Sequence, residues 1–142
     1  MQRVGFFRCR FGLTASNRVL ILVHDYHSVA DDDYIDDDRF GALIGSNAFR
    51  KAMQFAYDSD VGLLHVHLHN HYGIPRPSNT DLRETRAFVP DFFNVRPNVP
   101  HGAVILSRDK MSGRLWSPSD RQPYQIDRIV SVGTPLRFLS QS

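Results

Sequence analysis

The chain has 142 residues, of which 42% are hydrophobic and 23% charged, and this suffices for one domain with a buried core. A formal net charge of +2 does not favour a nucleic-acid partner, and Arg3, Arg8 and Arg10 are interpreted as parts of solvated faces. The single cysteine, Cys9, excludes an internal disulfide and a zinc site built on paired cysteines. Without an apolar run of membrane-spanning length or a signal-peptide pattern, we expect a cytoplasmic protein with no membrane partner.

The first part of the chain predicts two strands followed by an acidic loop. Residues 4–10 and 18–24 are rich in apolar side chains, and the second run is continuous enough to predict a strand buried on both faces. Residues 31–38 contain six aspartates, but they lack the glycine and the final glutamate of an EF-hand calcium loop. We therefore interpret this segment as a solvated loop whose charges repel one another.

A helix and a short strand are predicted next. Ser46 is a suitable N-cap for a helix that runs to about residue 57, with apolar residues spaced three and four apart on one face. Residues 61–67 follow as a short, mainly apolar run, which predicts a strand.

A second helix is predicted to begin at Ser78. Asp81 lies three residues later, which is the spacing of a capping box. The helix is expected either to end before Pro90 or to continue in broken form to Phe93. The apolar segment 88–95 is interpreted as core or as an exposed contact surface.

The last part of the chain predicts further strands. Apolar runs suggest strands over residues 102–107, 114–116, 126–132 and 136–139, with a turn at 110–113. The order of strand pair, helix, strand, helix and further strands predicts an α+β (α/β-like) domain spanning residues 1–142. Its expected architecture is a mixed central β-sheet flanked by helices.

Four histidines occupy alternate positions at the end of the third predicted strand: His65, His67, His69 and His71. In an extended chain, alternate side chains share one face, so the imidazoles are expected along one edge. Two imidazoles together with the carboxylate of Asp81 would give three metal ligands and leave a fourth position open. Such ligands favour zinc, with iron and manganese as alternatives. Ser78 is expected to cap the helix, to stabilise an oxyanion, or to do both.

The segment HNHYGIPRPSNTD, residues 69–81, resembles the JAMM motif of the JAB/MPN (Mov34) metalloproteases, His-x-His followed by Ser-x-x-Asp. It is also similar to the RadC-type branch, where His-Asn-His precedes a Gly-x-Pro-x-Pro-Ser-x-x-Asp string. The resemblance implies a prokaryotic-type MPN/cytidine-deaminase-like architecture, and the chain is expected to lack the family's usual N-terminal helix. It also implies a zinc-dependent peptidase or isopeptidase, whose partner is a protein or peptide substrate, with ubiquitin-like proteins as candidates.

The spacing of the motif leaves two choices of ligands. His69 and His71 are followed by six residues before Ser78, whereas His67 and His69 are followed by eight. The flanking residues favour His69, His71 and Asp81 as ligands, with His67 as the alternative ligand, and His65 is interpreted as structural.

The resemblance also implies an upstream glutamate that acts as general base. The matching string, QRVG, places Gln2 at that position, and an amide cannot accept the proton. The only glutamate in the chain is Glu84, which lies downstream. Two explanations follow: a chain that lacks its natural start, or a catalytically impaired zinc-binding scaffold that mediates protein–protein interaction. Asp25 is a candidate substitute for the base, although no spacing argument supports it.

Overall fold

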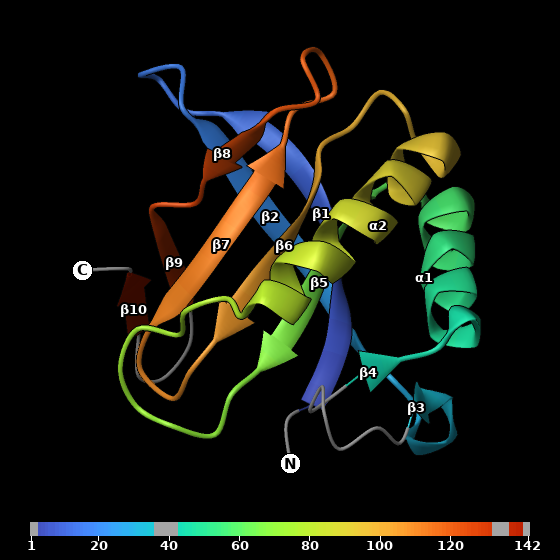
Figure 1. Ribbon diagram of the computed structural model, residues 1–142. Helices are drawn as coiled ribbons and strands as arrows, with labels where there is room; N and C mark the ends of the chain where they lie inside the picture. The colour runs from blue at the N-terminus through green and yellow to red at the C-terminus, as the bar shows by residue number, and fades with distance from the viewer. Residues whose placement is uncertain (1–2, 36–42, 132–136, 141–142) are drawn as a thin grey trace.

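The computed structural model describes residues 3–35, 43–131 and 137–140, and Figure 1 shows a twisted sheet with two helices packed against it. The strands of the main sheet are β1 (Arg3–Leu13), β2 (Val19–Ser28), β5 (Gly62–Leu68), β6 (His101–Leu106), β7 (Met111–Trp116) and β8 (Pro123–Gln125). The helices are α1 (Ser46–Ser59) and α2 (Asn79–Val95). Two small antiparallel pairs complete the fold: β3 (Tyr34–Ile35) with β4 (Leu43–Ile44), and β9 (Arg128–Ser131) with β10 (Arg137–Ser140).

The main sheet is mixed, and its only parallel neighbours among the described residues are its two central strands. The strand order is β2-β1-β5-β6-β7-β8, with β5 parallel to β6 and every other neighbouring pair antiparallel. Helix α2 connects β5 to β6, as a crossover between parallel strands requires. The predicted α+β class with a mixed sheet is therefore confirmed. Both helices lie on the same side of the sheet, where they contact its central strands (Figure 1).

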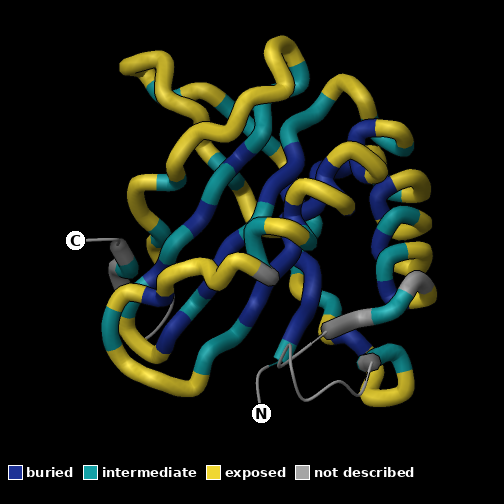
Figure 2. Tube along the Cα trace, viewed as in Figure 1, coloured by how far each residue is buried: buried dark blue, intermediate teal, exposed yellow. Residues whose placement is uncertain are grey.

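Buried side chains form one cluster on each face of the sheet. Leu63 belongs to the cluster under the helices, together with Phe6, Phe88 and Phe92. The next residue, Leu64, belongs to the opposite cluster, whose buried members are Cys9, Leu64, Val104 and Leu115, with Ile126 and Ile129 packed against it. This alternation buries β5 on both faces, and Figure 2 shows the central strands as the most deeply buried part of the molecule.

Helix α2 continues through Pro90 to Val95, beyond both predicted ends. Proline removes one backbone hydrogen bond from a helix, but here it lies on the exposed side. Phe88, Val89, Phe92 and Phe93 are buried around it. We attribute the continuation to this packing, and the segment 88–95 supplies core rather than an exposed contact surface. Of the described helices, neither is long and apolar enough to cross a membrane.

The prediction that residues 18–24 form a strand buried on both faces is wrong in its burial. The strand exists as β2, but it lies at the edge of the sheet and pairs only with β1 among the described strands. Leu22 and Val23 are each about half exposed, at 51% and 50%. An apolar run specifies a strand without specifying whether a neighbouring layer covers it.

Other boundaries differ by a few residues. Gly45 is the N-cap of α1, so the helix begins at Ser46 itself. The turn between β6 and β7 lies at residues 107–110, where the Ser107 N–H donates to the Lys110 carbonyl, and not at 110–113. Strand β8 was not predicted, since its three residues are all exposed and carry no apolar alternation.

The acidic segment begins with a single 3-10 turn, Asp31–Asp33. Its carboxylates pair with cations: Asp31 lies 2.8 Å from the Arg3 guanidinium, and Asp33 lies 2.6 Å from the Lys51 ammonium. The repulsion expected within this turn is therefore partly balanced by neighbours. The second group of aspartates, residues 36–38, lies outside the described residues, as do positions 132 and 136 of the last predicted strands.

The close approach of β6 and β7 leads to a first prediction. A Cβ at Gly102 would lie 2.2 Å from the backbone oxygen of Arg114, which the β6–β7 pairing holds in place. We expect Gly102→Ala to reduce the free energy of unfolding by roughly 1–3 kcal/mol in chemical denaturation. Gly12→Ala is the control, because nothing lies within 4 Å of its added Cβ, and its effect should stay within about 0.5 kcal/mol. Equal denaturation midpoints for the two variants would contradict this reading of the sheet.

Candidate metal centre

Three side chains from two elements converge beside the carboxyl end of β5. His67 lies in β5, His69 follows its last residue, and Asp81 lies in the first turn of α2. Each offers one ligand atom, and these atoms all lie within 4.8 Å of one another. His67 is buried, at 4% exposure, while His69 and Asp81 are half-buried. Two imidazoles and a carboxylate in this arrangement could hold a metal ion.

The nitrogen atoms of the two histidines fit this role. Nε2 of His67 and Nε2 of His69 are both buried and have no hydrogen-bond partner among the described residues. Buried polar atoms are normally paired, so two such atoms side by side require an explanation. A coordinated cation would supply the missing partner for both. Burial, together with the neighbouring His67, lowers the pKa of His69 and so favours the neutral imidazole that a metal requires.

Strand β5 and its extension place the histidines on one edge. Leu63, His65 and His67 face the helices, as the alternation of a strand predicts. Beyond the last strand residue, the His69 N–H still donates to the Leu106 carbonyl at 2.8 Å. This bond prolongs the pairing with β6, so His69 keeps the orientation that the alternation assigns to it.

The loop between His69 and the helix is held against the β6–β7 turn. The Arg108 N–H donates to the His71 carbonyl, and the Gly73 N–H donates to the Asp109 carboxylate, both at 2.8 Å. The Ser107 hydroxyl donates to the Gly73 carbonyl at 2.6 Å. Gly73 has a φ of 93°, which side-chain-bearing residues rarely adopt. These contacts fix the path by which the chain turns back towards the start of α2.

The predicted capping box is present and orients Asp81. The Ser78 hydroxyl accepts from the Asp81 N–H at 3.1 Å, and Asp81 Oδ2 accepts from the Ser78 N–H at 2.8 Å. The other carboxylate oxygen, Oδ1, lies 3.2 Å from His67 Nδ1. Burial would raise the pKa of Asp81, but the bonds to His67 and Ser78 outweigh it and hold that pKa at about 2. Asp81 is therefore a carboxylate anion at neutral pH.

The structure brings together the alternative ligand set of the sequence analysis. His71, the favoured partner of His69, is exposed, and its Nε2 lies 3.1 Å from His69 Nδ1. It lies outside the group formed by His67, His69 and Asp81. Since His71 contacts the outer nitrogen of His69, it is placed to orient that ring, and the geometry favours His67 as the second imidazole ligand.

His65 lies deeper, among aromatic side chains. Its ring packs on Phe88 at 4.6 Å and on Phe6 at 5.6 Å between centroids, and it stacks on Phe49 at 6.3 Å. Burial, with the nearby His67, lowers the pKa of His65 to about 3, so the ring is neutral. This environment agrees with the structural role expected for His65.

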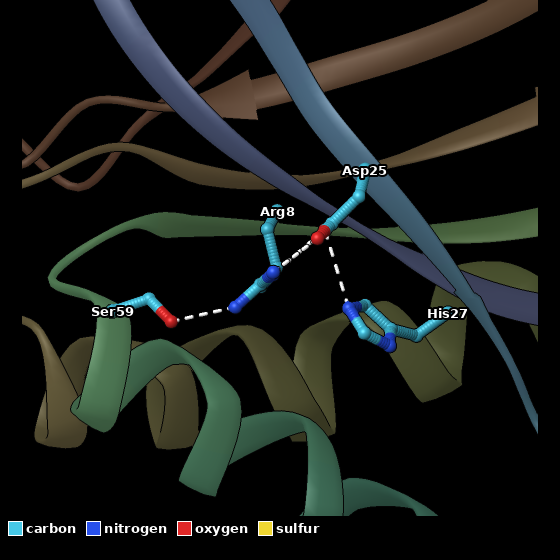
Figure 3. A network of polar contacts seen from close by, with 4 residues as sticks. All are labelled: Arg8, Asp25, His27 and Ser59. Carbon is cyan, nitrogen blue, oxygen red and sulfur yellow. Dashed lines mark hydrogen bonds and ion pairs between the residues drawn. The ribbon is translucent and has the colours of Figure 1, made fainter.

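Asp25, the candidate substitute for a general base, is engaged elsewhere. Figure 3 shows its carboxylate accepting from the Arg8 guanidinium, which also donates to the Ser59 hydroxyl at 2.6 Å, while His27 Nε2 lies 3.2 Å from Asp25. The bond to Arg8 lowers the pKa of Asp25 to about 2 against the effect of burial. The prediction that Arg8 lies on a solvated face is therefore wrong. Gln2 lies outside the described residues.

Sequence reasoning missed Glu84 as a site residue. A pocket beside the metal group is lined by His65, His67, Pro77, Asp81, Glu84 and Thr85 from β5 and the α2 side, and by residues of β6 and β7 including Arg114. Burial, and then the carboxylate of Asp81, raise the pKa of Glu84 to about 7, against an opposite effect of His67. Its position three residues after Asp81 was a usable signal, because such residues are neighbours on a helix surface.

Comparison with models of known protein families finds no match, and comparison with curated proteins finds none either. The functional interpretation therefore depends on the side chains of this chain and on their chemistry.

The choice between His67 and His71 can be tested by metal content. We expect His67→Ala to lose most of the bound metal, since it removes a buried ligand, whereas His71→Ala should keep most of it. Purified variants would be measured by elemental analysis after dialysis against metal-free buffer. Loss of metal in His71→Ala with retention in His67→Ala would contradict the assignment.

The raised pKa of Glu84 predicts a pH dependence for the metal-free protein. Because the folded-state pKa, about 7, exceeds the ordinary value of 4.5, the folded state binds more protons between these values. Stability should therefore fall as the pH rises through this window. At pH 8, Glu84→Gln should be roughly 1–2 kcal/mol more stable than the wild type, after allowance for partial exposure, and about equal at pH 4.

Urea denaturation of chelator-treated protein measures this difference. Asp91→Asn is a matched control, since it removes an exposed carboxylate from the same helix. If Asp91→Asn gains as much stability at pH 8 as Glu84→Gln, the effect arises from the charge of the helix and not from the burial of Glu84.

Proposed function

We propose that this chain is a zinc-dependent JAMM-type hydrolase of peptide or isopeptide bonds, with an MPN-like architecture. The observation that carries the proposal is the convergence of His67, His69 and Asp81 beside a pocket. Three ligands of this kind leave a coordination position for water or substrate, as catalytic zinc sites do. The order His-x-His followed by Ser-x-x-Asp, kept by His67, His69, Ser78 and Asp81, resembles the JAMM motif with one residue more than the family spacing, and it supports the same reaction class.

The ligand chemistry favours zinc among the common metals. Two imidazole nitrogens and one carboxylate oxygen suit zinc, whereas calcium and magnesium prefer oxygen ligands throughout. Bound zinc would supply a Lewis acid that polarises the scissile carbonyl and acidifies water.

The side chains of the chain have distinct tasks in this proposal. His67 and His69 each use one ring nitrogen to hold the cation. Asp81 neutralises part of its charge, and the capping box keeps the carboxylate facing β5. Ser78 accepts a hydrogen bond through its oxygen, so its hydroxyl proton remains available to donate to an oxyanion on the substrate.

A second candidate function is a zinc-stabilised MPN-like scaffold that binds partner proteins. The observation that favours it is the row of apolar side chains on the edge strand β2, where Val19, Leu20, Leu22 and Val23 are each about half exposed. Exposed apolar edge strands are a common means of pairing with another chain. Gln2 stands at the position of the family glutamate and cannot accept a proton, which also favours the scaffold.

Cleavage assays separate the two candidates. The zinc-loaded protein would be incubated with a proteome-derived peptide library and with a lysine-linked ubiquitin dimer, and new termini would be identified by mass spectrometry. We expect cleavage of at least one of these substrates, with loss of cleavage in Asp81→Ala and after chelation. Asp91→Asn, which leaves the site intact, should remain active. Full zinc occupancy without any cleavage would contradict the hydrolase and favour the scaffold.

A further inference from the structure

The pocket beside the metal group contains a carboxyl group that the proposed ligands do not include. His67 and Asp81 line this pocket, so it is continuous with the group that would hold the cation. Glu84 lines the same pocket from the next turn of α2. Residues three apart on a helix lie on neighbouring parts of its surface, so Asp81 and Glu84 face the site together.

Glu84 differs from Asp81 and Asp25, the other two carboxylates considered for the reaction, in having no hydrogen-bond or ion-pair partner among the described residues. Asp81 is held by Ser78 and faces His67, whereas Asp25 is paired with Arg8 in a separate network. Glu84 is half-buried and makes no hydrogen bond or ion pair with another described residue. A carboxyl group in such a place retains its capacity to bind and release a proton.

A purely structural role does not explain Glu84. Glutamate is a good helix former, but alanine or leucine would suit a half-buried helix position at least as well. Partial burial of a carboxylate beside a second carboxylate is unfavourable to stability. Groups that reduce stability in this way, at the edge of a cleft, are typical of functional sites.

We propose that Glu84, which lines one pocket with the ligands His67 and Asp81, is the proton acceptor of the hydrolysis proposed above. The inference rests on that proposed function and adds a residue to it. Gln2, which stands at the position of the family's general base, cannot accept a proton, whereas Glu84 can.

The step balances without any further reactant. A Glu84 carboxylate oxygen accepts a proton from the attacking water, so one O–H bond breaks and a new one forms on Glu84. The water oxygen bonds to the carbonyl carbon, and the carbonyl electron pair moves to its oxygen, beside the Ser78 hydroxyl. When that pair returns, the C–N bond breaks and Glu84 donates its proton to the leaving nitrogen. The products are a carboxylic acid and an amine, and Glu84 is again a carboxylate.

Proton counting with a hydroxamate tests this role without an activity assay. Acetohydroxamic acid chelates catalytic zinc and loses a proton when it binds, as the attacking water does. Calorimetric titration of the zinc-loaded protein in buffers of different ionisation enthalpy measures how many protons reach the solvent. If Glu84 takes the proton, the wild type should release almost none at pH 8, where Glu84 is mainly a carboxylate, and Glu84→Gln should release about one. The variant should also bind acetohydroxamic acid more weakly.

Three variants make the outcomes distinct. Asp91→Asn should behave as the wild type, and Glu84→Asp, which keeps a shorter carboxylate, should partly restore proton uptake. Glu84→Gln should keep its zinc, and once a substrate is known its kcat should fall by about 10²–10⁴-fold.

Three results would contradict the proposed role of Glu84. Equal proton release by the wild type and Glu84→Gln, with binding intact, would overturn the role of Glu84 while leaving the hydrolase standing. Loss of zinc in Glu84→Gln would make Glu84 a ligand and also overturn it. Failure of the zinc-loaded wild type to bind acetohydroxamic acid would overturn the proposed hydrolase, and this inference with it.

Discussion

The site depends on one constraint, the position of the first turn of α2 against the end of β5. Asp81 serves both elements at once: Oδ2 accepts from the Ser78 N–H and so fixes the start of the helix, while Oδ1 faces His67 Nδ1 across the gap to the strand. Removing either contact would leave a buried histidine or a helix terminus without its partner. The contacts that anchor the intervening loop to the β6–β7 turn serve the same end, because they bring the chain back to Ser78.

His65 and His67 are both buried, His69 is half-buried and His71 is exposed, and the chemistry of the four histidines differs accordingly. His65, His67 and His69 each keep one buried nitrogen without a partner in the described part of the chain, but His65 is enclosed by phenylalanines and lies outside the metal group, and His71 is exposed. Of these four identical side chains, only His67 and His69 are both shielded from water and placed to bind a cation together with Asp81. Desolvation strengthens the attraction between a cation and Asp81, since the local dielectric constant is lower than that of water.

Much of this arrangement follows from the sequence, but the part set by tertiary packing does not. The alternation of the histidines, the capping box and the α+β order of elements depend on local periodicity and are predictable. Pro90 lies inside α2 because phenylalanines on both sides of it are buried, and β2 is exposed because it lies at a sheet edge. The choice of His67 over His71 depends on how far the strand pairing extends past Leu68, and the pocket that Glu84 lines is formed by tertiary packing of α2 against β5, β6 and β7. Apart from the position of Glu84 three residues after Asp81, none of these features can be read from the spacing of residues alone.

The most direct test of the metal site proposed for His67, His69 and Asp81 is to locate the metal. Anomalous diffraction at the zinc absorption edge, from crystals of protein purified without added metal, would do so. The predicted result is a single strong peak bonded to one ring nitrogen of His67, one ring nitrogen of His69 and a carboxylate oxygen of Asp81, at about 2.0–2.2 Å from each. A peak between His69 and His71 that leaves His67 uncoordinated, or no peak in protein that keeps its fold, would contradict it.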